Sequence, residues 1–407
     1  MRLLYRCCAG LDVHAAEVVA GIRVVKGRRV REEVRSFGTT TRGLLELADW
    51  LEAEGVTHAV LEATGVYWKP VWHVLEGRFE LVLANAQDVR NVPGRKTDVS
   101  DAAWLADLLA HGLVRSSMVP PEPIQELRDL TRTRKQLVRE MVRHVQRIQK
   151  TLEDANIKLT EAISDLMGVS GRAILSALIA GEDNPEQLAR LAHARLQTPR
   201  EELVEALRGR IRDHHRFMLR LHMEQVQALE SSIRKLDEHL EAVLHPFREA
   251  IELLTTIPGV SQIVAQVIVA EVGVDMSRFP SARHLVSWAG LCPRMDKSAG
   301  KHRSTRLRKG APWLKSVLMQ AAWSTVRTRN SYLRAQFHRL RSRRGPKKAI
   351  VAVAASMLTA IYYMLERGRP YHDLGHDHFD RHDKEVLVRR LARRIRDLGY
   401  EVEVRAA

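Results

Sequence analysis

The sequence predicts an α/β domain at the N-terminus, then a long helical coiled-coil region, and then a mainly α-helical C-terminal domain with a helix-hairpin-helix. Three observations support this fold class. Aliphatic runs broken by turn residues occupy the first part, an apolar repeat in steps of three and four follows a proline-rich break, and two apolar stretches meet at an Ile-Pro-Gly-Val turn. The predicted boundaries are 1–118, 119–250 and 251–370, with a polar tail at 371–407.

Three strands open the predicted N-terminal domain. The first two lie in YRCCAGLDVHAAEVVAGIRVV, the turn KGRR follows, and the third lies in VREEVRSFG. Asp12 leaves the first strand. A later run, HAVLEAT, has the aliphatic content of a buried strand, and Gly65 breaks the chain soon after Glu62. Two acids therefore stand at strand ends.

Asp98 and Asp101 are three residues apart at the start of an apolar-periodic segment, in RKTDVSDAAWLADLL. A helix capped by Thr97 would place both carboxylates on one face. Mg²⁺ is a hard cation that takes a few carboxylate oxygens and otherwise keeps water and phosphate oxygens. Taken singly, each acid is better explained as a turn residue or as an acid that favours a helix macrodipole. The order of two strand acids and a helical pair favours a metal site.

The composition predicts a phosphate-bearing partner. Lys and Arg total 65 against 49 acids, which gives a net charge of +16 and a pI near 10.1. Three cysteines, Cys7, Cys8 and Cys292, have neither disulfide nor zinc spacing and are expected to be packing residues in a reducing cytoplasm. We expect no signal peptide, and the apolar stretch 349–365 predicts a buried core helix.

The region after 120–123 reads as a long helix with a coiled-coil seam. A second helical segment, 214–244, has compatible spacing, so the two helices would pack antiparallel or pair between protomers. Residues 165–200 predict only a short helical connector. The seam positions of the first helix are Ile124, Leu127, Thr131, Arg134, Val138, Met141, Val145, Ile148, Leu152, Ala155 and Leu159.

A basic stripe follows the first long helix in steps of three and four. It suits a helix laid along a phosphate backbone, or equally the solvated flank of a coiled coil. Further along, the turn at Pro258 and Gly259 could bring backbone amides close to a phosphate, or could simply pack two helices. Both alternatives stay open for each feature. The stripe consists of Arg128, Arg132, Lys135, Arg139, Arg143, Arg147 and Lys150.

A strongly basic loop surrounds Ser298 and contains one acid, Asp296. Its small neighbours, Ala299 and Gly300, would let a DNA strand come close. Ser298 could act as a nucleophile if it were activated, although a serine in such a loop is more simply a hydrogen-bond donor to phosphate. The basic residues of the loop are Arg294, Lys297, Lys301, Arg303, Arg306, Arg308 and Lys309.

The order of these motifs resembles a known family across nearly the whole chain. The chain is similar to insertion-sequence transposases with an N-terminal RuvC-like DEDD domain and a C-terminal serine domain, the bridge-RNA-guided recombinases, which are related to pilin-gene invertases. The motifs that carry the resemblance are GLDVHA, LEATGVYW, KTDVSDA, the IPGV hairpin, WAGLCPR, the SAGK loop, KGAPWLK with LMQAAW, and RRGPKKAIVAVA.

The resemblance implies that Asp12, Glu62, Asp98 and Asp101 bind Mg²⁺ in an RNase H-like (RuvC-like) fold. It also implies that Ser298 attacks a DNA phosphate to form a phosphoserine intermediate. In this family the sites are composite between protomers of a dimer or tetramer, and a noncoding guide RNA from the element pairs with donor and target DNA. The family loop usually reads Ser-Gly-Gly, so Ala299 departs from the pattern. A bacterial, cytoplasmic, nucleoid-associated protein is expected.

Two other functions stay open. A junction-resolving nuclease would use the acids alone to activate water, and a non-catalytic nucleic-acid-binding scaffold would bind without cutting. The tail contains His372, His376, His378 and His382, and we expect a solvated tail with a short basic helix rather than a metal cluster.

Overall fold

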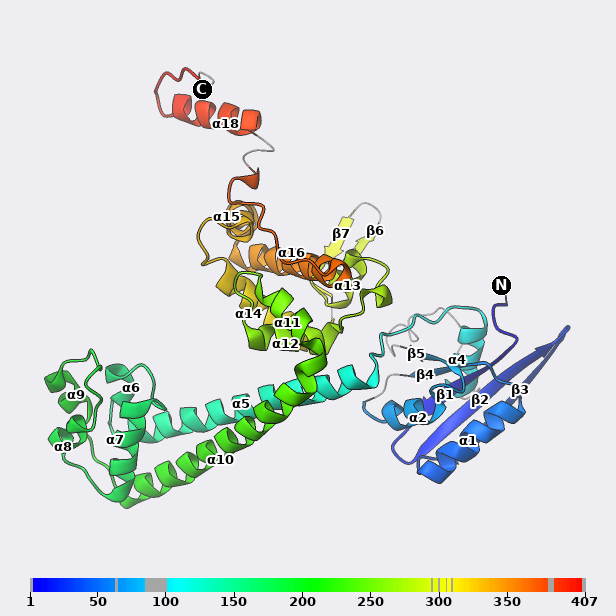
Figure 1. Cartoon of the computed structure of the whole chain (residues 1–407), viewed down its shortest axis with the longest axis horizontal. Helices are drawn as coiled ribbons and strands as arrows, with labels where there is room; N and C mark the ends of the chain where they lie inside the picture. Colours follow the sequence, from blue (N-terminus) through cyan, green and yellow to red (C-terminus); the bar gives the residue numbers. More distant parts are fainter. Residues whose placement is uncertain are drawn as a thin grey trace. The chain divides into compact units, whose positions relative to one another are not determined.

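The computed structural model (Figure 1) divides the chain into two compact units, Met1–Val119 and Pro120–Ala407, which are described separately. For 296–298, 302–303 and 384–387 only the backbone is described. The structure describes residues 3–62, 65–84, 101–293, 296–298, 301–304, 306–308, 310–379 and 384–404.

The first unit contains a five-stranded mixed sheet in the order β3-β2-β1-β4-β5. The first three strands pair antiparallel, which confirms the three strands predicted at the N-terminus, while β4 runs parallel to β1 and β5 runs parallel to β4. Gly27 turns the chain between β2 and β3 with φ +62°. The strands are β1 Cys7–Val13, β2 Glu17–Lys26, β3 Arg29–Gly38, β4 His58–Glu62 and β5 Glu80–Ala84.

Helices cover both faces of this sheet. On one face, α1 (Thr41–Ala53) and α2 (Trp68–Leu75) contribute to an aliphatic core that also contains Leu11 and Leu61. On the other face, α4 (Asp101–Ala110) packs through Leu105 and Leu109 against Cys8 and Val60. Because side chains alternate along a strand, neighbouring residues of β1 and β4 serve different layers.

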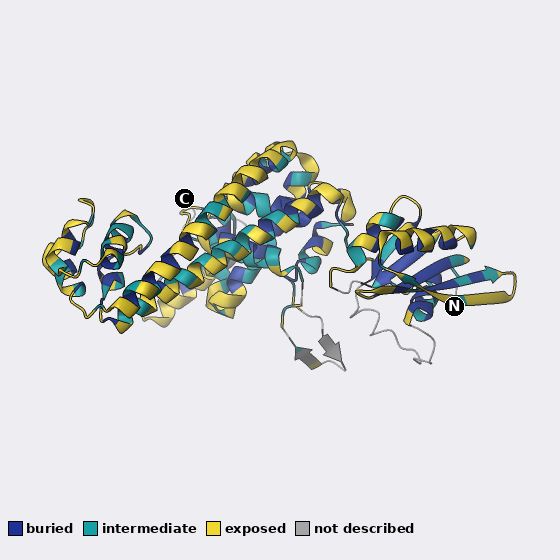
Figure 2. Ribbon diagram, turned by 90° about the horizontal axis from the view of Figure 1, so that it is seen from below, coloured by how far each residue is buried: buried dark blue, intermediate teal, exposed yellow. Residues whose placement is uncertain are grey.

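The second unit begins with a helical hairpin, α5 (Glu122–Asp154) and α10 (Asp213–Leu244). The helices run antiparallel within one chain: Arg134 pairs with Asp237 at 2.5 Å toward one end, and His215 contacts Asp154 at 2.8 Å at the other. Of the two alternatives left open by the sequence, antiparallel packing of the two helices or pairing between protomers, the structure shows antiparallel packing within one chain. Figure 2 shows that exposed residues also run along both helices.

The segment between the hairpin arms is a small helical cluster with a core of its own. That core includes Leu175, Leu188 and Leu203 and continues onto Ile148 and Leu152 of α5. The predicted short connector is therefore a packed cap on the tip of the hairpin. Its helices are α6 Leu159–Ala162, α7 Val169–Ala180, α8 Pro185–Arg190 and α9 Arg200–Ala206.

The C-terminal part is mainly α-helical and packs around α16 (Pro346–Arg367). By length and composition this helix could cross a membrane, but half of its apolar window is buried in the fold, as expected of a core helix. The remaining elements are η1 His245–Phe247, α11 Arg248–Thr255, α12 Gln262–Val272, η2 Met276–Arg278, α13 Ala282–Trp288, β6 Asp296–Ser298, β7 Lys301–Ser304, α14 Pro312–Thr325, α15 Tyr332–Arg344 and α18 Lys384–Asp397.

Candidate active site

Asp12 and Glu62 lie at the same level on neighbouring strands. In the parallel pairing of β1 with β4, Leu11 lies opposite Leu61, and each acid is the next residue of its strand. Leu11 and Leu61 point into the core under α1, so the alternation directs both acids to the face that α4 covers. The imidazole of His14 lies 3.3 Å from the Asp12 carboxylate.

Helix α4 brings Asp101 toward the same end of the sheet. The thiol of Cys8 donates to the carbonyl of Ala106 at 3.3 Å, and Gly10, two residues further along β1, contacts the carbonyl of Ala102. The helix therefore runs antiparallel to β1. Its first residue, Asp101, lies beside the end of β1 that carries the first acid.

Two glycines allow α4 to approach the sheet this closely. Gly10 and Gly21 are cross-strand partners in β1 and β2. A Cβ on Gly10 would lie 2.1 Å from the carbonyl oxygen of Ala102, and one on Gly21 would lie 2.7 Å from the amide nitrogen of Ala103. Because neither distance is compatible with a side chain, only glycine fits. This contact sets the position of the first turn of α4 and hence of Asp101.

The described part of the site contains three of the four predicted acids. Asp98 and the predicted cap Thr97 lie outside the described residues. Among the residues that are described, no three His, Cys, Asp or Glu side chains form a group that could hold a metal ion by themselves. The carboxylates brought to this edge of the sheet are the ligand type that suits Mg²⁺, and the imidazole of His14 lies beside the carboxylate of Asp12.

Ser298 ends β6 at the tip of a two-stranded hairpin. Its backbone pairs with Lys301, the first residue of β7. The base of the hairpin is closed by a bridge between Pro293 and Leu307. Lys301, Arg306 and Arg308 are exposed; Arg294 and Lys309 lie outside the described residues, and for Lys297, Ser298 and Arg303 only the backbone is described.

The first two residues of the basic stripe on α5, Arg128 and Arg132, form contacts within the protein. Arg132 forms a bidentate ion pair with Glu271 of α12, with both N–O distances at 2.8 Å. Arg128 donates to the backbone carbonyls of Ala270, at 3.0 Å, and Glu271. Glu271 is almost fully buried, and burial lowers the pKa of Arg128 to about 10. These contacts attach α5 to the C-terminal helices.

The indole ring of Trp313, at the start of α14, lies close to three cationic side chains of the stripe. The charged groups of Arg132, Lys135 and Arg139 lie 5.7, 5.7 and 5.4 Å from the centroid of its ring. Lys135 also donates to Ser316 Oγ at 2.5 Å, and burial, assisted by Arg139, lowers its pKa. Further along α5 the stripe is exposed, at Arg143, Arg147 and Lys150.

Gly259 lies in the turn between α11 and α12 and has φ +83°. A Cβ at this position would lie 2.5 Å from Thr325 Oγ1, and the same hydroxyl donates to the carbonyls of Pro258 and, at 2.8 Å, Ala321. The turn is therefore packed against the end of α14. This contact supports the packing alternative for Gly259.

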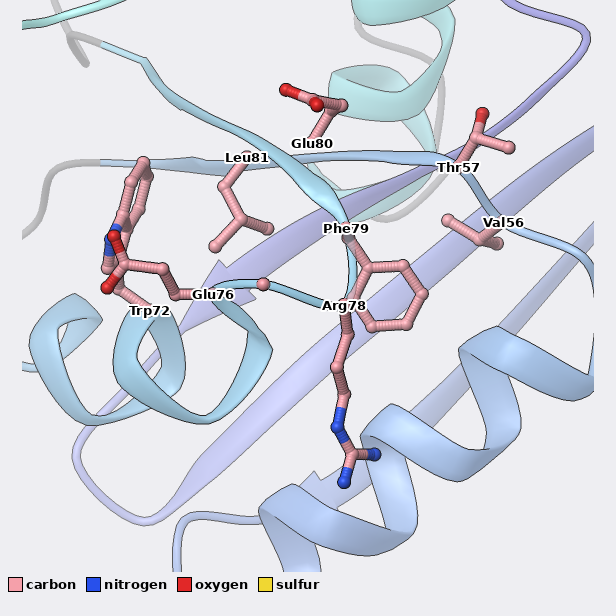
Figure 3. A pocket seen from close by; sticks show the side chains of 9 residues that line it. Val56, Thr57, Trp72, Glu76, Arg78, Phe79, Glu80 and Leu81 are labelled. Carbon is pink, nitrogen blue, oxygen red and sulfur yellow. The ribbon is translucent and has the colours of Figure 1, made fainter.

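A pocket of about 570 Å³ lies at the other end of the sheet (Figure 3). Its lining includes Thr57, the residue before β4, and Glu80, the first residue of β5, together with Trp72, Arg78 and Phe79. Glu62 lies at the opposite end of β4. The pocket is thus separate from the acids.

Sequence reasoning missed the residues whose role depends on a distant partner. Glu271 carried a signal, because it is the only charged residue of a helix made mostly of aliphatic residues. Trp313 and Gly10 carried none, since their importance follows from α5 and α4 packing against them.

Two segments of the chain match models of known protein families. Residues 9–157 match a family model for DEDD transposases of the IS110 type, described as "Transposase". Residues 251–338 match the model described as "Transposase IS116/IS110/IS902 family". These two matches identify the class of protein as an insertion-sequence transposase. The chain belongs to the IS116/IS110/IS902 family within that class.

Several curated proteins are similar to the chain. The pilin gene-inverting protein of Moraxella bovis is 23% identical over 84% of this chain and 91% of its own length. The insertion element IS110 uncharacterized 43.6 kDa protein of Streptomyces coelicolor is 34% identical over 36% of this chain and 35% of its own length. Like that protein, the putative transposase y4pF/y4sB of Sinorhizobium fredii exceeds 30% identity (33%), but this chain covers only 40% of its length.

Proposed function

We propose that this protein is a DNA transposase or recombinase that cleaves and exchanges strands through a phosphoserine intermediate. The observation that carries the proposal is the convergence of Asp12, Glu62 and Asp101 on one end of the sheet, in a chain whose second unit presents Ser298 at the tip of a basic hairpin. The mixed sheet supports an RNase H-like fold for the first unit.

Asp12, Glu62 and Asp101, with Asp98 three residues earlier in the sequence, are the residues that would hold Mg²⁺. Their fit to this ion rests on hard carboxylate oxygens gathered at one edge of the sheet. When bound, the ion would neutralise the scissile phosphate and stabilise the leaving oxygen. The close packing of α4 against Gly10 holds Asp101 at that edge.

Ser298 is the proposed nucleophile. Its Oγ forms a bond to the phosphorus while the bond from phosphorus to one deoxyribose oxygen breaks. The serine proton goes to solvent or to a nearby base, and the departing oxygen takes up a proton. One phosphodiester replaces another, so attack by a new DNA hydroxyl can release the serine and join strands without an external energy source.

The remaining cationic surface supports nucleic-acid binding. Arg143 and Arg147 are exposed on α5, and Arg139 and Lys135 form no ion pair among the described residues. We assign them to phosphate contacts, with Arg306 and Arg308 beside the hairpin and with Arg294, Lys297, Lys301, Arg303 and Lys309. We assign Arg132 and Gly259 to the internal contacts described above. A guide RNA from the element would supply base recognition while the protein reads backbone and shape.

The first experiment combines the protein with Mg²⁺, DNA carrying the element junction, and RNA transcribed from the element ends. A denaturing gel should show a DNA-linked protein band in wild type and in Ser304→Ala, a serine control in the same hairpin. The band should be absent in Ser298→Ala and Asp12→Ala. Cleavage without an adduct would instead indicate a junction-resolving nuclease, and binding without cleavage a scaffold.

A mixing experiment tests the proposed homo-oligomer. If the acids and the serine that act on one phosphate come from different protomers, a mixture of Asp12→Ala and Ser298→Ala should recover part of the adduct that each variant lacks. Failure to recover any adduct from well-folded, co-purified variants would contradict the composite site.

A further inference from the structure

A second pocket, of about 320 Å³, lies beside the first turns of α15. Three segments line it: the turn before the helix, the helix itself, and the chain that follows α16. Its polar lining consists of Arg329, Asn330, Ser331, Arg334, His338 and His376, and among the described residues that line it none is acidic.

The helix and the turn before it place two cations and two uncharged polar groups at the pocket. Asn330 has φ +56°, a left-handed conformation that reverses the chain just before α15. Ser331 then caps the helix by accepting from the amide of Arg334 at 3.3 Å. Arg334 and His338 are four residues apart and therefore share one face of α15.

The segment after α16 carries His376 to the pocket. Asp373 Oδ1 accepts hydrogen bonds from the amides of Tyr332, at 2.9 Å, and Gly375, at 2.8 Å. The ring of Phe379 stacks on Tyr332 with centroids 5.1 Å apart. This part of the tail is thus attached to α15, in contrast to the solvated tail expected from its composition.

The two guanidinium groups at the pocket form no ion pair with a described carboxylate, although the carboxylate of Asp373 is hydrogen-bonded to the same two segments, at Tyr332 and Gly375. Neither Arg329 nor Arg334 takes part in an ion pair among the described residues, and the guanidinium of Arg334 donates a hydrogen bond to the carbonyl of Arg327, at 3.4 Å. Burial, together with Arg341 and Arg334, lowers the pKa of His338. A bound anion would offset this local positive potential.

We propose that this pocket binds a phosphate group. Two guanidinium groups provide forked donors of the kind that match phosphate oxygens, and Ser331, Asn330 and the imidazoles provide further polar groups. On the basis of the proposed function, the phosphate belongs to the backbone of a bound nucleic acid. Free phosphate has the same chemistry and is distinguished by the experiment.

The test uses the full-length protein and labelled duplex DNA, with anisotropy measured over a range of salt. Replacing Arg334 by Gln should weaken binding about tenfold at 0.1 M salt and reduce the slope of log K against log salt by roughly 0.9, the value for one phosphate contact. Arg343→Gln removes the same charge from an exposed position of α15 outside the pocket and should leave the slope unchanged. Arg334→Lys should recover part of the loss.

A second arm uses inorganic phosphate. Phosphate should raise the thermal midpoint of wild type above that in chloride of equal ionic strength, and Arg334→Gln should abolish this difference. If phosphate has this effect but the DNA slopes of Arg334→Gln and wild type agree, the site is for free phosphate and the assignment to nucleic acid is overturned. If Arg334→Gln and Arg343→Gln have the same salt slope and the same thermal response to phosphate, the pocket does not bind phosphate and the proposal is wrong. Adduct formation by wild type would still support the proposed function.

Discussion

Replacing Gly10 with Ala tests whether the close packing of α4 on β1 determines the position of Asp101 relative to the other acidic residues. The added Cβ would lie 2.1 Å from the carbonyl oxygen of Ala102, whereas ordinary contacts begin near 3.4 Å, so the first turn of α4 must move by about 1.3 Å. Asp101 moves with it. A displacement of about 1 Å at a catalytic group can cost roughly 100-fold in rate, and overpacking at such a site costs about 1–3 kcal/mol of stability.

The assay is the rate of adduct formation as a function of Mg²⁺ concentration, measured beside urea unfolding. Gly10→Ala should lower the rate about 100-fold and require more Mg²⁺. Gly38→Ala is the matched control, because its Cβ would meet only Thr40 Oγ1 at 3.9 Å. Leu47→Ala, in the core on the opposite face of the sheet, controls for lost stability alone.

The reasoning would be refuted by a folded Gly10→Ala protein that reacts within about twofold of wild type at the same Mg²⁺ concentration. It would also be refuted if Leu47→Ala lost activity and metal response to the same extent, because a general loss of stability would then explain both.

Three further predictions follow from buried groups. Glu271→Ala should lower the free energy of unfolding in urea by about 3 kcal/mol, because it leaves two guanidinium groups on α5 without their buried partner; an unchanged value would contradict this role. Burial raises the pKa of Cys8 to about 12, so a thiol reagent at pH 8 should modify the half-exposed Cys292 long before Cys8, as mass spectrometry of the labelled peptides would report. Burial lowers the pKa of His222, so the unfolded chain takes up a proton at this position at a higher pH than the folded chain. The free energy of unfolding should therefore be fully retained above about pH 6.5 and decrease as the pH falls below that value. His222→Asn should make this decrease smaller in urea unfolding measured across the pH range.

Local patterns predicted much of the fold. The aliphatic runs around Asp12 and before Glu62 were sufficient to predict two strands with an acid near the end of each, because strands covered on both faces have continuous apolar sequences. Asp12 was expected to follow its strand and is instead the last residue but one of β1. The long helices also followed from their periodicity. The predicted start of the second, at 214, differs by one residue from the helix Asp213–Leu244.

Features that depend on residues far away in the sequence could not be predicted from local sequence patterns. The helical spacing of the basic stripe on α5 was predicted correctly. That its first residues bind Glu271 could not be predicted, because Glu271 lies on a helix about 140 residues later in the chain. Likewise, the short helices after α5 owe their order to the core they share with Leu152, so their composition alone suggested a plain connector. Gly10 resembles any strand glycine until α4 is in place.

The antiparallel hairpin starts and ends at the same base. Arg128 joins the beginning of α5 to α12, and α10 returns through η1 to α11, which precedes α12 in the chain. The arms can therefore change length together without disturbing that base. Removing one heptad from each arm would shorten the hairpin by about 10 Å and preserve its facing pattern, so paired seven-residue insertions or deletions are the length changes this architecture tolerates.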